Sequence, residues 1–207
     1  MDVWEMAHGE RLQIAEQLEA LPEEAWTEPT LCEGWTVADV VGHMTAIGTM
    51  STGRFVKGML GNRLNFGAFQ AEGIAAVTKD KSPAEILEAF RATAESRAKP
   101  PGPKTTVLGE VLVHGEDIFR PRRTGFGQHP VENVVTVADF YKRNGFPLKV
   151  KRRIAGVTLR MTDGDWSFGS GPEVAGLGIS ILMAMVGRKI ALSDLQGEGV
   201  AVLSGRS

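Results

Sequence analysis

The sequence predicts a mainly α-helical protein in two parts, a bundle of helices over residues 1–145 and a small α/β part over residues 146–207. Three observations lead to this prediction. Five segments repeat apolar residues at the spacing of a helix, and capping or helix-breaking residues stand between them. After Gly145 the pattern changes, and apolar and polar residues begin to alternate as they do in strands.

The first helix is expected over residues 3–21, where apolar residues form an approximate stripe and Pro22 ends it. The second is expected to begin at Thr36, a favourable N-cap. Asp39, three residues on, completes a capping box in which Asp replaces Glu. This helix could continue through Met50 toward Leu60. Residues 61–80 are rich in glycine and predict a long connection with some helix.

Three further helices are expected in the first 145 residues. Ser82, Pro83 and Glu85 combine a cap, a first-turn proline and a capping-box acid, and they predict a helix to about residue 98. A helix over residues 105–119 carries apolar side chains around much of its circumference, which indicates burial among other helices. Pro130 opens the last, over residues 131–143.

The tail is expected to be a small α/β unit. Two alternating runs, 157–161 and 165–169, flank an Asp-Gly turn and predict a β-hairpin. A helix over residues 172–186 and a final strand over residues 200–203 complete the prediction.

Composition excludes several classes of protein. The chain is 43% hydrophobic and 23% charged with a net charge of -2, so no basic excess points to nucleic acid. Its N-terminus lacks the pattern of a signal peptide, and its longest apolar stretch, 174–186, is shorter than the roughly 20 residues of a membrane span. A single cysteine, Cys32, allows no internal disulfide and fits a cytoplasmic protein.

The residues most suggestive of chemistry are Glu110 and His114. Their spacing of four places both side chains on one helix face, which suits two ligands of one metal ion. Glu110 stands in an apolar segment, where an ionised carboxylate is costly unless it is paired or metal-bound. A third ligand, His43, would complete a His2Glu set with an open position, as in catalytic zinc sites. Iron, nickel, cobalt and manganese accept the same donors.

Simpler interpretations compete with this one. Glu110 and His114 could form a salt bridge between helices, and His43 could be a core histidine bonded to a carbonyl. The spacing alone does not establish that residues 43 and 114 meet. We assign no role to His8 or His129. Cys32 has no basic neighbour in sequence to favour a thiolate, which predicts an inert thiol. Five arginines could grip an anionic ligand, although most such side chains are solvated: Arg54, Arg63, Arg120, Arg122 and Arg123.

Two motifs carry a resemblance to a known family. The stretch GWTVADVVGHM (34–44) has the pattern GWT-x-x-D-x-x-x-H, and GEVLVHGEDIFRP (109–121) has the pattern E-x-x-x-H-G-x-D-I. Together, in this order, they resemble the metal-bearing helices of the DinB / mycothiol-dependent maleylpyruvate isomerase superfamily. More loosely, MVGRK (185–189) and EGVAVL (198–203) resemble its C-terminal domain.

The resemblance implies a DinB-like four-helix bundle that holds a divalent metal, zinc above all, with His43, Glu110 and His114. It also implies a low-molecular-weight thiol, mycothiol, as nucleophile or cofactor, and the absence of a well-placed cysteine in the chain fits an external thiol. Asp117 is expected to orient His114 from the side away from the metal. The expected partners are the thiol and a small electrophile, without nucleic acid or membrane, and a homodimer is compatible with the sequence.

Three functions follow as hypotheses. The first is a thiol-dependent isomerase or transferase, since a coordinating thiol is deprotonated and can add to an electrophilic carbon. The second is a metal-dependent hydrolase with water as nucleophile. The third is a non-catalytic protein that binds a lipid or another apolar ligand between the hairpin and the helix over 174–186.

Overall fold

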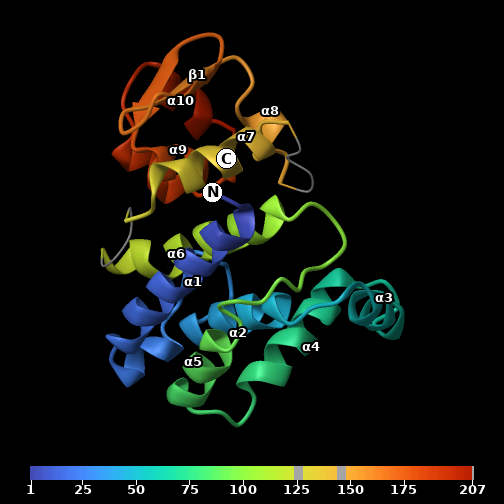
Figure 1. The fold of residues 1–207 in the computed structure, drawn as a ribbon. Helices are drawn as coiled ribbons and strands as arrows, with labels where there is room; N and C mark the ends of the chain where they lie inside the picture. Colours follow the sequence, from blue (N-terminus) through green and yellow to red (C-terminus); the bar gives the residue numbers. More distant parts are fainter. Residues whose placement is uncertain (124–127, 144–147, 207) are drawn as a thin grey trace. The chain divides into compact units, whose positions relative to one another are not determined.

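The computed structural model describes residues 1–123, 128–143 and 148–206 (Figure 1). The chain divides into two compact units, residues 1–125 and 126–207. The expected boundary between residues 145 and 146 lies outside the described residues and stays a prediction. No helix in the described part of the chain is long and apolar enough to cross a membrane.

Four helices of the first unit form the predicted four-helix bundle. Each helix packs against two others, so that contacts join α1 to α6, α6 to α2, α2 to α5 and α5 back to α1 (Figure 1). This arrangement gives the bundle one shared core. The helices are α1 (Val3–Glu19), α2 (Val37–Gly48), α5 (Pro83–Arg91) and α6 (Thr105–Phe119).

Local capping explains where two of these helices begin. At α2, the Thr36 hydroxyl accepts a hydrogen bond from the Asp39 backbone N–H at 3.2 Å, and the Asp39 carboxylate accepts one from the Thr36 N–H at 2.9 Å. Ser82 and Glu85 form the same reciprocal pair at α5. Both capping boxes satisfy backbone donors that the first turn leaves unpaired, as the sequence predicts. The helix α5 nevertheless ends at Arg91, seven residues before its expected end.

Two helices stand where the sequence predicts a continuation and a connection. The chain breaks after α2, and a separate helix, α3 (Thr52–Gly61), follows. The segment expected to be a long connection with some helix contains a helix of 13 residues, α4 (Phe66–Thr78), which Asn65 caps by accepting from the Ala68 N–H at 3.0 Å. A short 3-10 helix, η1 (Glu23–Thr27), lies between α1 and α2.

Glycines in α2 and α4 let these two helices pack closely together. A Cβ atom at Gly42 of α2 would lie 2.6 Å from the Thr78 methyl group of α4. A Cβ atom at Gly73 of α4 would lie 3.4 Å from the Ala46 Cβ of α2. Glycine is a weak helix former in isolation, so tertiary packing decides the conformation of this segment.

The second unit is a three-stranded sheet covered by helices. The strands are in the order β2-β1-β3, with β1 antiparallel to β2 and parallel to β3, and the helix α9 contacts both β1 and β3. The predicted hairpin is confirmed as β1 and β2. The elements are α7 (Val131–Tyr141), α8 (Val150–Arg153), β1 (Thr158–Met161), β2 (Ser167–Gly169), β3 (Glu173–Gly176), α9 (Gly178–Met185), η3 (Lys189–Asp194) and α10 (Gly199–Ser204). A 3-10 turn, η2 (Arg120–Arg122), ends the first unit's last helix.

Two predictions for the tail are wrong. The expected helix over residues 172–186 is a strand, β3, followed by the shorter helix α9. The expected strand over residues 200–203 is the helix α10, of which only Gly199 and Leu203 are buried. A short apolar run fits either a strand or a helix. The run that forms β3 is a strand because it pairs with β1. The run that forms α10 is a helix whose two buried residues, Gly199 and Leu203, are four positions apart.

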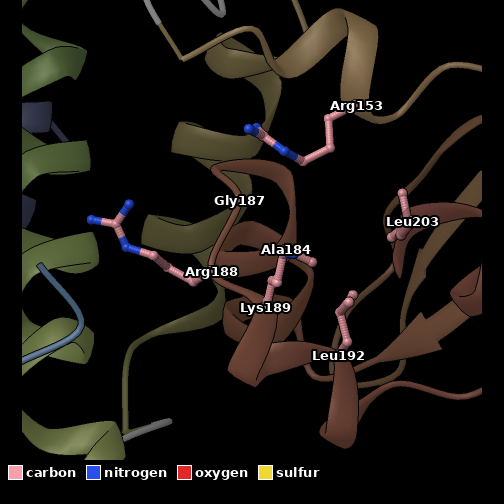
Figure 2. Close-up of a pocket in the computed structure, with 7 residues that line it drawn as sticks. All are labelled: Arg153, Ala184, Gly187, Arg188, Lys189, Leu192 and Leu203. Carbon is pink, nitrogen blue, oxygen red and sulfur yellow. The ribbon is translucent and has the colours of Figure 1, made fainter. Parts of the chain in front are cut away.

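The helix α9 is a core element rather than the wall of a ligand pocket. All eight of its residues are buried, and Arg153 binds its C-terminal end by donating to the Met185 carbonyl at 2.7 Å. Figure 2 shows the space between Arg153, Ala184 and Leu203, which has no room for a water molecule. The hypothesis of an apolar-ligand pocket at this helix therefore gains no support here.

Candidate metal centre

The side chains of His43, Glu110 and His114 converge inside the four-helix bundle. Oε2 of Glu110 lies 3.3 Å from Nε2 of His43 and 3.1 Å from Nε2 of His114. The three potential ligand atoms all lie within 4.8 Å of one another. The structure thus brings residue 43 to residues 110 and 114, which the spacing alone left open.

Two helices supply these groups. Glu110 and His114 stand one turn apart on α6, and His43 stands in the middle of α2, which packs against α6. The two imidazole rings meet edge to face, with centroids 5.0 Å apart and an interplanar angle of 85°. Because both helices belong to the bundle, the three side chains are held by its packing rather than by a loop.

The cluster lies at a partly accessible position. The side chains of His43 and His114 are 9% and 12% exposed, whereas that of Glu110 is 37% exposed. Burial acts to raise the pKa of Glu110, but the hydrogen bonds and charges of His114 and His43 outweigh it and lower that pKa. A carboxylate that remains ionised beside two imidazoles is a suitable ligand for a divalent cation.

Asp117 contacts the other ring nitrogen of His114. Its Oδ2 lies 3.0 Å from Nδ1 of His114, and its side chain is fully buried. Burial acts to lower the pKa of His114, but the hydrogen bonds with Asp117, Cys32 and Glu110 outweigh it and raise that pKa well above its usual value. Glu110, His114 and Asp117 therefore share one face of α6, with one carboxylate on each side of the imidazole.

The position of Cys32 corrects the sequence interpretation. Its Sγ lies 3.1 Å from Oδ2 of Asp117 and 3.5 Å from Nδ1 of His114, so the chain does have a cysteine beside this cluster. Cys32 belongs to a tight loop, residues 29–36, that is closed by a bridge between Pro29 and Thr36. The sequence offers no local signal for this contact, because 82 residues separate Cys32 from His114.

The same loop places Trp35 against the histidines. The indole centroid lies 5.0 Å from that of His43 and 6.3 Å from that of His114. Trp35 also lines a cavity of about 340 Å³ between the loop, α2 and α4. The cavity is large enough for a small molecule. Its other walls are formed by Gly34, Asp39, Gly67, Gln70, Ala71, Ile74, Ala75 and Thr78.

The remaining candidates lie apart from the cluster or are otherwise engaged. His8 lies on α1 and His129 in the second unit. Arg120 forms a buried ion pair with Glu116 at 2.6 Å, and Arg122 pairs with Glu28 at 2.8 Å. Arg54, Arg63 and Arg123 are exposed. None of the five arginines is thereby identified as an anion ligand.

Fold and site together define a class of protein: a four-helix bundle whose facing helices bring two histidines and a carboxylate to one internal point. Helical bundles commonly build metal and cofactor sites in this way. A comparison with family models finds a similarity over the helical part of the chain. Residues 7–103 match the family described as "Mycothiol maleylpyruvate isomerase N-terminal domain". This helical part of the chain is similar to that family, and the resemblance to the DinB / mycothiol-dependent maleylpyruvate isomerase superfamily is confirmed.

The matched residues include Cys32, Trp35 and His43, and the match ends before Glu110. Two solved structures extend the likeness to nearly the whole chain. They are crystal structures of the mycothiol-dependent maleylpyruvate isomerase and of a histidine-to-alanine mutant of it, at 16% and 15% identity. Each has a TM-score of 0.62. Each match covers 95% of this chain and 91% of the chain in the crystal structure. At this identity the likeness establishes a shared fold. No curated protein matches the chain.

Proposed function

We propose that this protein is a metal-dependent enzyme of the mycothiol-dependent maleylpyruvate isomerase type. It would use a low-molecular-weight thiol to isomerise a small electrophile or to transfer sulfur to it. His43, Glu110 and His114 would hold the metal. Zinc is the best fit, because two imidazoles and one carboxylate form a set that catalytic zinc sites use.

The observation that carries the proposal is the convergence of three ligand atoms within 4.8 Å of one another. A structural salt bridge would need one histidine for the carboxylate, whereas here two imidazoles face the same oxygen of Glu110. Three protein ligands leave a fourth tetrahedral position open, which is the pattern of a catalytic site. The family of the helical domain supports the same conclusion.

The chemistry supplied by the bound metal and thiol is that of an activated nucleophile, because a coordinating thiol is deprotonated at neutral pH and adds reversibly to an electrophilic carbon. Residues of the chain would orient and surround the metal ligands. With a metal bound, the Nδ1–H of His114 would donate to Asp117, whose Oδ2 lies 3.0 Å away, and the lone pair of Nε2 would be left for the metal. The Trp35 indole lies beside the His43 ring, with the two ring centroids 5.0 Å apart.

The cavity beside Trp35 would hold a part of the thiol or of its substrate. Its lining is polar at Asp39, Gln70 and Thr78 and otherwise apolar, and it includes no cationic side chain. A small, uncharged or hydroxyl-rich group would fit this lining better than an anion, because no positive charge would balance the anion there. A cytoplasmic location and a homodimer remain predictions. Light scattering of the purified protein would test the second.

Cobalt substitution tests the proposal directly. The Co2+-loaded protein should bind one ion, and addition of mycothiol should change its visible spectrum because sulfur enters the coordination sphere. Maleylpyruvate should then isomerise only when metal and thiol are both present. Glutathione, a thiol of different overall structure, is the control that tests recognition of the rest of the mycothiol molecule.

Two results would contradict the proposal. Failure of the wild-type protein to bind Co2+ or Zn2+ at micromolar concentration would reduce the cluster to an ion pair. An unchanged cobalt spectrum with mycothiol, together with metal-dependent hydrolysis of a simple ester, would instead favour the hydrolase, in which water occupies the open position.

A further inference from the structure

Cys32 and His114 meet at one carboxylate oxygen. The thiol donates to Oδ2 of Asp117 at 3.1 Å, and Nδ1 of His114 lies 3.0 Å from the same atom. Asp117 is fully buried, and its Oδ2 is the point where a loop of the chain reaches α6. The role proposed above for Asp117, which is to orient His114, involves no contribution from the Cys32 thiol.

The backbone, rather than the thiol, fixes where Cys32 lies. The N–H of Leu31 donates to the carbonyl of Asp117 at 3.1 Å, which ties the loop to α6 beside the cluster. Within the loop, the N–H of Cys32 donates to the Thr30 hydroxyl at 3.1 Å, and the N–H of Trp35 donates to the Cys32 carbonyl at 3.0 Å. A change of the Cys32 side chain should therefore leave the loop in place.

The arrangement bears on which nitrogen of His114 can bind a metal. A neutral imidazole has one N–H and one lone pair, so a proton on Nδ1 leaves Nε2 as the ligand. A buried carboxylate at Nδ1 favours this tautomer, but only while the carboxylate keeps its orientation. A second donor on the same oxygen, the Cys32 thiol, holds it there.

We propose that Cys32 is a positioning residue of the candidate metal centre: its thiol holds Oδ2 of Asp117 on Nδ1 of His114, so that Nε2 faces the metal. This inference rests on the proposed function, because it assigns Cys32 a role toward the same metal. It assigns the thiol neither to the metal nor to the substrate.

A competing role for Cys32 is visible in the same geometry. Cys32, His114 and Asp117 also bring potential ligand atoms within 4.8 Å of one another, on the Nδ1 side of the ring. A neutral His114 cannot serve both sets at once, because it has one lone pair. The His43–Glu110–His114 set is favoured because metal binding there keeps the hydrogen bond that the Cys32 thiol donates to Asp117 at 3.1 Å.

The test compares Cys32→Ala with Cys32→Ser in the full-length protein. Serine keeps a donor for Asp117, so its Zn2+ dissociation constant should stay within about threefold of wild type. Alanine should weaken Zn2+ binding by about 10–100-fold, as the loss of partners behind a metal ligand commonly does. In an Asp117→Ala background the Cys32→Ala change should have no further effect, because the thiol acts through that carboxylate.

Spectroscopy separates positioning from a merely structural role. In the zinc-loaded protein, the 15N NMR spectrum should show an Nδ1–H of His114 that exchanges slowly with solvent in wild type and Cys32→Ser and much faster in Cys32→Ala. Circular dichroism should show the same helix content in all three proteins.

Three results separate the possible failures. Equal zinc affinity and an equal Nδ1–H signal in wild type and Cys32→Ala would overturn the inference. A sulfur-to-cobalt charge-transfer band in the Co2+ protein without added thiol, lost in Cys32→Ala, would make Cys32 a metal ligand and would also overturn it. Failure of the wild-type protein to bind Zn2+ would refute the proposed function itself.

Discussion

The indole of Trp35 lies against the imidazole of His43, with ring centroids 5.0 Å apart. A paramagnetic ion at His43 should therefore quench the fluorescence of Trp35 more strongly than that of the other three tryptophans. Titration of the metal-free protein with Co2+ should quench emission and saturate at one equivalent. Trp35→Phe should bind Co2+ with similar affinity but lose most of the quenching. Equal quenching in that variant would show that the ion binds elsewhere.

Removal of any one candidate ligand should abolish stoichiometric metal binding. His43→Ala, Glu110→Gln and His114→Ala should each weaken Zn2+ binding by more than about 100-fold, because losses behind a ligand already cost about 10–100-fold. Metal analysis after gel filtration measures this occupancy. His129→Ala is the matched control, since this histidine lies in the other unit. Full occupancy in His114→Ala would refute the assignment of the ligands.

The metal-free protein should gain most stability from this cluster between about pH 4.5 and 6.5. The pKa of Glu110 is lowered from its usual 4.5, so its contribution is present above that value and is lost as the pH falls through the lowered pKa. The pKa of His114 is raised from its usual 6.5, so its contribution is complete below that value and is lost as the pH rises through the raised pKa. Thermal unfolding with a chelator present should show both declines. A profile unchanged in Glu110→Gln would contradict this account.

Zinc binding should strengthen as the pH rises above 6.5. His114 carries a proton on Nε2 when it is charged, and the metal must displace it. The dissociation constant should fall by up to about tenfold per pH unit until the raised pKa of His114 is passed. Calorimetry in two buffers of different ionisation enthalpy would count the released proton. Proton release that does not change between pH 6.5 and the plateau would contradict the prediction.

The ion pair of Glu116 and Arg120 should contribute to stability rather than to catalysis. Their side chains are 0% and 3% exposed and lie 2.6 Å apart, one turn from each other at the end of α6. Arg120→Met would leave a buried carboxylate without this partner and should cost about 3–5 kcal/mol in urea unfolding. The double variant Glu116→Leu/Arg120→Met should recover most of that loss. A double variant no more stable than the single one would show that the arginine acts through other contacts.

Much of the bundle could be predicted because its determinants are local. The capping boxes at Thr36 and Ser82 involve residues only three positions apart, and α6 has the bounds expected from its flanking prolines and apolar pattern. Glu110 and His114 could be paired for the same reason, since a single helical turn joins them. The resemblance to a family then indicated His43, which no spacing connects to α6.

The rest depends on contacts between distant residues. The loop carrying Cys32 reaches Asp117 across 85 residues, so neighbouring sequence gives no indication that the thiol is near the cluster. The strand β3 exists because it pairs with β1, and α4 because Gly42 and Gly73 allow it to approach α2. Such tertiary effects override local preference in short or glycine-rich segments.

The spacing of Glu110, His114 and Asp117 along about two turns of α6 has a consequence for how this gene can vary. Substitutions at the intervening positions leave the three side chains in register. A codon inserted or deleted between Glu110 and His114 rotates one of them by about 100° around the helix axis, since a turn contains 3.6 residues. The coding segment for these eight positions should therefore tolerate point changes far better than changes in its length.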